Sequence, residues 1–246
     1  MRGLTESWYT LRASVRALRA WPVLLGFASR SVLWSTGIVV LAYVIAKLAV
    51  PDGRWWASAP TLGIGFLFAV YIATVNDAAL ITQVNGALDG VDPSIHNGFS
   101  TVATRRRQLA PWVLATAIAT YALNAIDGWV VGTLAGGLWL SVTLLVLPTI
   151  TLENVGGIVG IANALDHFRR NWARCLLGSA LLTVTSVALM SVGLGLLVLK
   201  PESTGLMLLL SILALMCLLP AVVYALALIL VYQTVLYREL VATRPD

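Results

Sequence analysis

The sequence predicts an all-α, polytopic membrane protein with about six transmembrane helices and three amphipathic helices on the cytoplasmic side. Three observations lead to this prediction. Hydrophobic residues make up 59% of the 246 residues and charged residues only 11%, whereas a soluble domain carries about 25% charged residues. The apolar residues form runs long enough to cross the roughly 30 Å hydrocarbon core of a bilayer. Most of the arginines cluster between these runs.

Six apolar runs are each long enough to cross the bilayer, which takes about 20 residues of helix. Trp21 and Pro22 mark the start of the first run, because proline is favoured in the first turn of a helix and tryptophan at the membrane interface. Pro220 should kink the last run. The predicted spans cover about 22–49, 58–84, 109–126, 129–152, 175–199 and 205–237, and the whole chain, 1–246, is predicted to be a single integral membrane domain.

Basic residues are distributed unevenly between the two sides of the predicted bundle. The short turns at 50–56, 124–128 and 199–203 share their side with only Lys47, Arg54 and Lys200. The opposite side holds twelve arginines: Arg2, Arg12, Arg16, Arg19, Arg105, Arg106, Arg107, Arg169, Arg170, Arg174, Arg238 and Arg244. Because cytoplasmic loops carry an excess of Lys and Arg, the sequence predicts a multi-pass protein of the cell membrane with both termini in the cytoplasm.

Three segments that precede the first, third and fifth runs carry apolar residues at helical spacing. They are 5–20, 93–107 and 157–173. Their apolar stripes are Leu4, Trp8, Leu11, Val15 and Leu18; Ile95, Phe99 and Val102; and Ile158, Ile161, Leu165, Phe168 and Trp172. Helices of this kind lie in the membrane interface with the apolar face toward the acyl chains. Packing on the bundle or on another protein is the alternative.

The lipid bilayer is therefore the predicted partner of the chain. Five arginines in and beside the second and third of these segments are predicted to bind anionic headgroups: Arg105, Arg106, Arg107, Arg169 and Arg170. A homo-oligomer or another membrane protein would also fit this layout. Nucleic acid is not expected despite the net charge of +5, because the basic residues flank apolar runs.

The same layout predicts an internal repeat. One unit, an amphipathic helix followed by a descending and a returning membrane helix, would occur three times in parallel orientation. Such repeats are related by an axis along the membrane normal. The junctions resemble one another weakly, as Leu18-Arg19-Ala20-Trp21-Pro22, Gln108-Leu109-Ala110-Pro111-Trp112 and Asn171-Trp172-Ala173-Arg174-Cys175. The repeat lengths are uneven, so this prediction depends on topology more than on identity.

A set of local motifs extends over nearly the whole chain. It comprises Ser7-Trp8, Asn76-Asp77-Ala78-Ala79-Leu80, Gly90-Val91-Asp92-Pro93-Ser94-Ile95, Gly98-Phe99, Pro111-Trp112-Val113-Leu114, Ala162-Asn163-Ala164-Leu165 and Arg169-Arg170-Asn171-Trp172. With these motifs the chain resembles a broad prokaryotic family of uncharacterised six-helix integral membrane proteins, similar in layout to the membrane-anchor domain of some glycerophosphodiester phosphodiesterases. The resemblance implies a six-helix layout and brings no established activity or site. Asp77 departs from it, since an apolar or small residue is expected there.

Five polar residues in the runs or at their ends form the candidate buried pair or pathway: Arg30, Asn76, Asp77, Glu153 and Gln233. A charged side chain at the bilayer centre costs about 2.5–3.5 kcal/mol on insertion scales. Arg30 and Asp77 lie at similar depth, counted from the cytoplasmic ends of neighbouring runs, so an ion pair between them is predicted. The alternatives are a solute or proton path past Asp77 and snorkelling of the charges to the interface.

No catalytic residue, cofactor site or metal site is predicted. Serine-nucleophile motifs, phosphate loops, CxxC pairs and HExxH are absent from the sequence. The sequence therefore favours a non-enzymatic accessory, scaffold or lipid-interacting component. One alternative is a transporter or channel for a small solute, with a polar path near Asn76, Asp77 and Glu153. Another is a lipid-modifying membrane enzyme, which would need Asp77 and Glu153 to face one cavity.

Overall fold

The computed structural model describes residues 2–49, 55–124, 129–199 and 203–242. Within these ranges the chain forms nine helices and no strand, so the prediction of an all-α protein is confirmed. The helices are α1 (Arg2–Ala20), α2 (Val23–Ala49), α3 (Trp55–Leu88), α4 (Ile95–Ala103), α5 (Arg106–Asn124), α6 (Trp129–Thr143), α7 (Val146–Leu152), α8 (Gly157–Val198) and α9 (Thr204–Ala242). The predicted turns at 50–56, 124–128 and 199–203 lie largely outside the described residues, as do Arg54, Lys200 and Arg244.

Five spans within the described ranges are long and apolar enough to cross a membrane. They are Val23–Ala49, Ser58–Leu88, Ala135–Leu152, Gly157–Val198 and Gly205–Val241. The sixth predicted span, 109–126, coincides with α5 and ends outside the described residues. Because α5 begins with Arg106, Arg107 and Gln108, its apolar part within the described residues starts only at Leu109.

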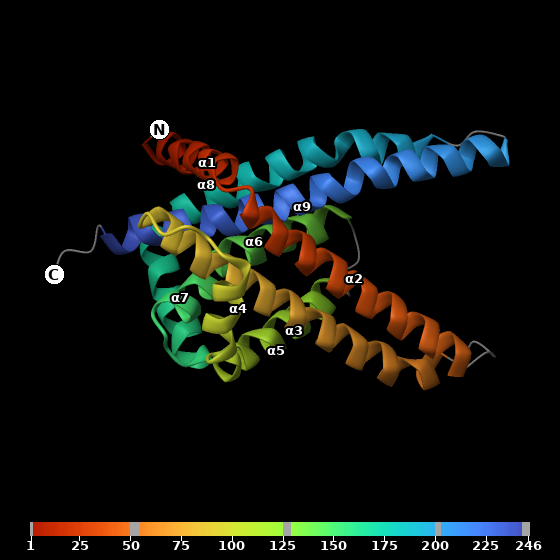
Figure 1. Cartoon of the computed structure of the whole chain (residues 1–246), viewed down its shortest axis with the longest axis horizontal. Helices are drawn as coiled ribbons and strands as arrows, with labels where there is room; N and C mark the ends of the chain where they lie inside the picture. The colour runs from red at the N-terminus through yellow and green to blue at the C-terminus, as the bar shows by residue number, and fades with distance from the viewer. Residues whose placement is uncertain (1, 50–54, 125–128, 200–202, 243–246) are drawn as a thin grey trace.

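Two long hairpins, α2–α3 and α8–α9, extend from a common body and diverge toward their turns (Figure 1). The opposite end of the molecule holds both termini together with α1 and α7 (Figure 1). We call this end the base. We call the outer parts of the two hairpins, residues 33–49 with 55–68 and residues 183–198 with 204–219, the arms.

The hydrophobic core lies in the base. Its largest fully buried side chains include Phe27 of α2, Leu80 of α3, Ile150 of α7 and Tyr232 of α9. The α9 residues 230–237 are buried on every face, as expected for a central helix that is apolar all round. The arms, by contrast, expose most of their large apolar side chains. In α2 beyond Ser31, only Ala42 and Ala46 are buried.

The predicted span 129–152 is two helices rather than one. α6 and α7 are separated by a turn at Leu144 and Leu145. Pro148 provides the physical reason, because its ring clashes with the carbonyl of the residue four positions earlier, which is Leu144, and its nitrogen cannot donate to that carbonyl. This break brings α7 across the base, where all six residues from Val146 to Thr151 are buried.

The predicted segments 157–173 and 175–199 form the single helix α8, with one irregular residue. Asn171 has φ −127° and ψ 26°, which is not helical, and its Nδ2 donates a hydrogen bond of 3.2 Å to the carbonyl of His167. The bend between the two segments therefore lies at Asn171, the first residue of the predicted junction 171–175. It separates a base segment from the part of α8 that enters the arm.

The predicted in-plane segment 5–20 lies within α1, which packs on the bundle. Its buried face is rich in small and hydroxyl side chains, and includes Ser7, Thr10 and Ser14 with Leu11 and Leu18. Val15 of the predicted apolar stripe is partly buried against the core, whereas Leu4 is 54% and Trp8 is 44% exposed. α1 thus contacts α8 and α9 and still presents an apolar edge beside its arginines.

Candidate functional site

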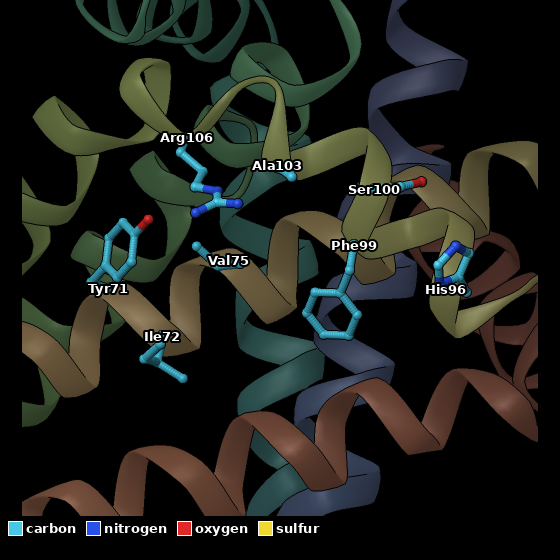
Figure 2. Close-up of a pocket in the computed structure, with 8 residues that line it drawn as sticks. All are labelled: Tyr71, Ile72, Val75, His96, Phe99, Ser100, Ala103 and Arg106. Atoms are coloured by element: carbon cyan, nitrogen blue, oxygen red, sulfur yellow. The ribbon is translucent and has the colours of Figure 1, made fainter.

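Two adjoining cavities lie between α2, α3, α4 and the start of α5. One has a volume of about 500 Å³ and is lined by α2, α3 and Phe99 of α4. The other has a volume of about 390 Å³ and is lined by α3, α4 and Arg106 of α5 (Figure 2). Ile72, Val75 and Phe99 line both cavities. We treat the two as one feature and call it the groove.

The groove is polar at one end and apolar along the rest of its length. Arg30, Trp34 and Ile38 line it from α2, each four residues from the next and therefore on one face of the helix. Asn76, Ile72 and Phe68 line it from α3 with the same spacing. Because α2 and α3 are antiparallel, Arg30 and Asn76 lie together toward the base. The aromatic and aliphatic residues follow toward the arm.

α4 closes the groove on the base side. Gly86, Ala87 and Gly90 end α3 in a tight cap, in which the Val91 amide donates 2.9 Å to the Gly86 carbonyl and Gly90 adopts φ 83°. The Ser94 amide then donates 2.6 Å to the side-chain oxygen of Gln83. These bonds turn the chain back over α3. As a result Phe99 reaches the Phe27 ring, with 5.7 Å between centroids.

Two arginines supply the charge of the groove. Arg30 and Arg106 line the larger and the smaller cavity respectively, and both are exposed. In Figure 2 the Arg106 side chain extends toward Tyr71 and Val75 of α3. Neither arginine forms an ion pair with any described residue. No carboxylate lines either cavity, so the groove carries uncompensated positive charge.

Asn76 is the buried polar residue of the groove. Its side chain is 4% exposed, and its Nδ2 donates a hydrogen bond of 2.7 Å to the carbonyl of Ile72. This bond identifies the nitrogen, so the other amide atom is the oxygen. That Oδ1 is buried and accepts no hydrogen bond from any described residue. A buried acceptor without a donor is costly, so a ligand that donates to it would stabilise the site.

The predicted ion pair between Arg30 and Asp77 is absent from the structure. The Oδ1 of Asp77 accepts a hydrogen bond of 3.0 Å from the hydroxyl of Ser31, which is 2% exposed. Consecutive residues of a helix point about 100° apart. Ser31 therefore faces α3, whereas Arg30 faces the groove. Asp77 is adjacent to Asn76 in sequence but does not line the groove.

Glu153 belongs to a separate polar cluster in the base, away from the groove residues. Its Oε1 accepts a hydrogen bond of 2.9 Å from the hydroxyl of Tyr237, and its Oε2 accepts one of 3.0 Å from Asn163. The Nε2 of His167 lies 3.5 Å from Oε1. The cluster joins α7, α8 and α9. Gln233 is buried one turn before Tyr237 on the same face of α9.

Sequence reasoning missed three partners of Glu153 and most of the groove. Asn163 and His167 lie on α8 and Tyr237 on α9, and the sequence does not show that these side chains face Glu153 at the end of α7. Of the groove residues of α4, only Phe99 belongs to the predicted apolar stripe. One usable signal was the spacing Arg30, Trp34 and Ile38, which puts a cation and two apolar groups on one face.

The five arginines predicted to bind headgroups differ in their surroundings, and two of them contact other residues of the chain. Arg105 donates a hydrogen bond to the carbonyl of Thr151 in α7. Arg170 pairs with Asp166 at 2.8 Å. Arg106 lines the groove, and Arg107 and Arg169 are exposed.

Comparisons of this chain with protein-family models, with curated proteins and with solved structures find no match.

Proposed function

We propose that the protein is a non-enzymatic, multi-pass component of the cell membrane that binds a membrane lipid in the groove. The observation that supports this most directly is the order of residues along the groove. A polar end with Arg30 and Asn76 leads into an apolar length with Trp34, Ile38 and Phe68. A lipid has the same order, with a headgroup followed by an acyl chain. A binding site for an acyl chain is also expected to be mostly apolar with a few placed polar groups.

The arrangement of the other polar residues supports lipid binding over a solute path. A path near Asn76, Asp77 and Glu153 would need these residues in one cavity, and of the three only Asn76 lines the groove. A lipid-modifying enzyme with Asp77 and Glu153 facing one cavity is disfavoured for the same reason. The Glu153 carboxylate is instead engaged by three side chains that tie α7 to α8 and α9.

We further propose that the base faces the cytoplasm and that the chain crosses the membrane six times, with α5 as the sixth span. The excess of arginine near the base supports this orientation. The hairpins α2–α3, α5–α6 and α8–α9 would be three parallel copies of one unit. α1, α4 and the first part of α8, up to Asn171, would be the helices that precede each copy.

The test of lipid binding is retention of lipid by purified protein. The full chain is purified in mild detergent, and the lipid bound per protein is measured by mass spectrometry. Ile72→Trp fills the part of the groove shared by both cavities. Ile64→Trp is the matched control, because Ile64 is 69% exposed on the same helix and lines neither cavity.

We expect wild type and Ile64→Trp to retain lipid and Ile72→Trp to lose it. Equal retention by the two variants would contradict the groove as the site. Absence of bound lipid from the wild-type protein would contradict the proposed function.

A further inference from the structure

We infer that the groove selects an anionic phospholipid whose headgroup carries a hydroxyl group, as phosphatidylglycerol does. This inference rests on the proposed function and adds the chemistry of the ligand. Three features of the groove support it: its charge, its unsatisfied acceptor and its apolar length.

The charge of the groove requires an anion. Arg30 and Arg106 present guanidinium groups to adjoining cavities in which no acid lines the wall. An arginine near the apolar part of a bilayer is costly unless it pairs with an opposite charge. A phosphate diester suits the planar guanidinium, which can donate two parallel hydrogen bonds to its oxygens. A zwitterionic headgroup brings its own positive charge into the groove, so it gains less binding free energy from the two arginines.

The acceptor of Asn76 requires a donor. Its Oδ1 has no partner among the described residues, and its Nδ2 is already used by the Ile72 carbonyl. A phosphate diester has only acceptor oxygens and cannot satisfy this atom. The choline headgroup also lacks a donor. A headgroup hydroxyl on an anionic lipid supplies the missing donor without adding a positive charge beside Arg30.

The apolar part of the groove would hold the acyl chain and so place the headgroup at Arg30 and Asn76. From Arg30 to Ile38 the helix rises by about 12 Å at about 1.5 Å per residue. Trp34, Ile38 and Phe68 line this length. An acyl chain along it would place the phosphate at Arg30 and Asn76. A headgroup hydroxyl close to the phosphate would then lie beside Asn76, and the rest of the headgroup would extend past Phe99 toward the smaller cavity, where His96 and Arg106 lie (Figure 2).

Three lipids that differ in net charge and in the presence of a headgroup hydroxyl test this inference on the wild-type protein. Phosphatidylglycerol is anionic with headgroup hydroxyls, phosphatidylmethanol is an anionic diester without a hydroxyl, and phosphatidylcholine is zwitterionic without one. The full chain is equilibrated with an equimolar mixture in detergent, and the protein-bound lipids are counted by native mass spectrometry.

We expect phosphatidylglycerol to be bound about fivefold more than phosphatidylmethanol, from one neutral hydrogen bond, and about tenfold more than phosphatidylcholine, from that hydrogen bond together with its net negative charge. Arg30→Gln should lower the preference over phosphatidylcholine to about the fivefold that the hydroxyl group supplies, and should leave the preference over phosphatidylmethanol unchanged. Asn76→Leu should abolish the preference over phosphatidylmethanol and lower the preference over phosphatidylcholine to about twofold, the part that charge supplies. Arg107→Gln is the control, because Arg107 is exposed next to Arg106 and lines neither cavity.

Each outcome separates the ligand chemistry from the proposed function. Equal binding of all three lipids would overturn the selectivity and leave lipid binding intact. Equal binding of the two anionic lipids would overturn the role of the hydroxyl group and of Asn76. Binding of none would overturn the proposed function as well. The wild-type measurement decides these outcomes even if Asn76→Leu fails to fold.

Discussion

At the scale of single residues, the direction in which a side chain points decides its partner. Arg30 and Asp77 lie at similar depth by residue count, and depth alone predicted their ion pair. The structure pairs Asp77 with Ser31 at 3.0 Å, since Ser31 and not Arg30 is on the face of α2 that contacts α3. The carboxylate and the guanidinium therefore have separate roles, one between helices and one in the groove.

This pairing predicts that Asp77→Asn is mild. The amide oxygen of asparagine can still accept the hydrogen bond from Ser31, so we expect the free energy of unfolding to change by less than about 1 kcal/mol. Thermal unfolding in detergent measures it, with Arg30→Gln as the companion variant. A loss of about 3–5 kcal/mol that Arg30→Gln restores would instead indicate the ion pair.

The carboxylate of Glu153 should contribute more to stability than that of Asp166. Glu153→Ala would remove the carboxylate that accepts hydrogen bonds from Tyr237 and Asn163 in the base. We expect a cost of about 2–3 kcal/mol in unfolding free energy, since partly buried donors lose a charged partner. Asp166→Ala is the control, because the Asp166–Arg170 pair is exposed and such pairs contribute about 0–1 kcal/mol. Similar losses in both variants would contradict a structural role for the cluster.

At the scale of helices, single glycines let the two helices of each long hairpin come close. A Cβ on Gly65 of α3 would overlap the Cβ of Ala42 in α2. A Cβ on Gly193 of α8 would lie 2.5 Å from Leu218 in α9. Small residues at such contacts are typical of helix packing in membranes, where close approach of backbones provides much of the attraction.

Neighbouring glycines of α3 should therefore respond in opposite ways to alanine. A methyl group added at Gly63 would meet no atom within 4 Å, so Gly63→Ala should stabilise the helix by about 0.5–1 kcal/mol. Gly65→Ala should destabilise the hairpin by about 1–3 kcal/mol through overpacking against Ala42. Thermal melting of both variants in one detergent checks this. If both variants were more stable than the wild type, α2 and α3 could move apart at Gly65 without loss of stability, and the close contact would not matter.

The sequence predicted the long helices well, because their signal is local. Runs of apolar residues and the pair Trp21-Pro22 depend on neighbours in the chain. The division of 129–152 into α6 and α7 was missed, although Pro148 was a visible cause. The predicted junction 171–175 contains the bend at Asn171, but the exact residue was not predicted because no proline marks it. The groove and the Glu153 cluster were not predicted, since they depend on how helices rotate about their own axes.

At the scale of the whole molecule, the packing is concentrated in the base. The side chains of α9 are buried from Leu230 to Tyr237, whereas those of its arm are mostly exposed. Ion pairs and hydrogen bonds tie the same region together. Arg238 pairs at 2.5 Å with Asp89, in the turn that follows α3, and Arg174 of α8 pairs with Glu239. The base is therefore the part that fixes how the helices are arranged.

The proposed orientation predicts which positions a reagent added outside the cell can reach. In a background with Cys175→Ser and Cys217→Ser, single cysteines replace Asp52, Asp127 or Glu202 in the predicted outer turns. We expect a membrane-impermeant maleimide to label all three in intact cells. Cysteines at Arg107 and Arg170 should be labelled only after the membrane is opened. Labelling of either arginine position in intact cells would reverse the orientation.

The two arms also set how the protein should respond to bilayer thickness. The apolar span of α9 has 37 residues, about 55 Å at about 1.5 Å per residue, against a hydrocarbon core of roughly 30 Å. Hydrophobic mismatch of this kind is relieved by tilt. The arms are free to tilt, because they join the body only at the base and Pro220 lies where the α9 arm meets it.

A thinner bilayer should therefore spread the arms further. Spin labels at Leu48 and Leu206, both exposed near the two tips, would report the distance between them by pulsed electron paramagnetic resonance. We expect a longer distance in short-chain than in long-chain phosphatidylcholine. Labels at Leu48 and Leu62, within one arm, should show no change. A constant distance between the tips would mean that the arms are rigid, whereas a variable one makes this fold a gauge of membrane thickness.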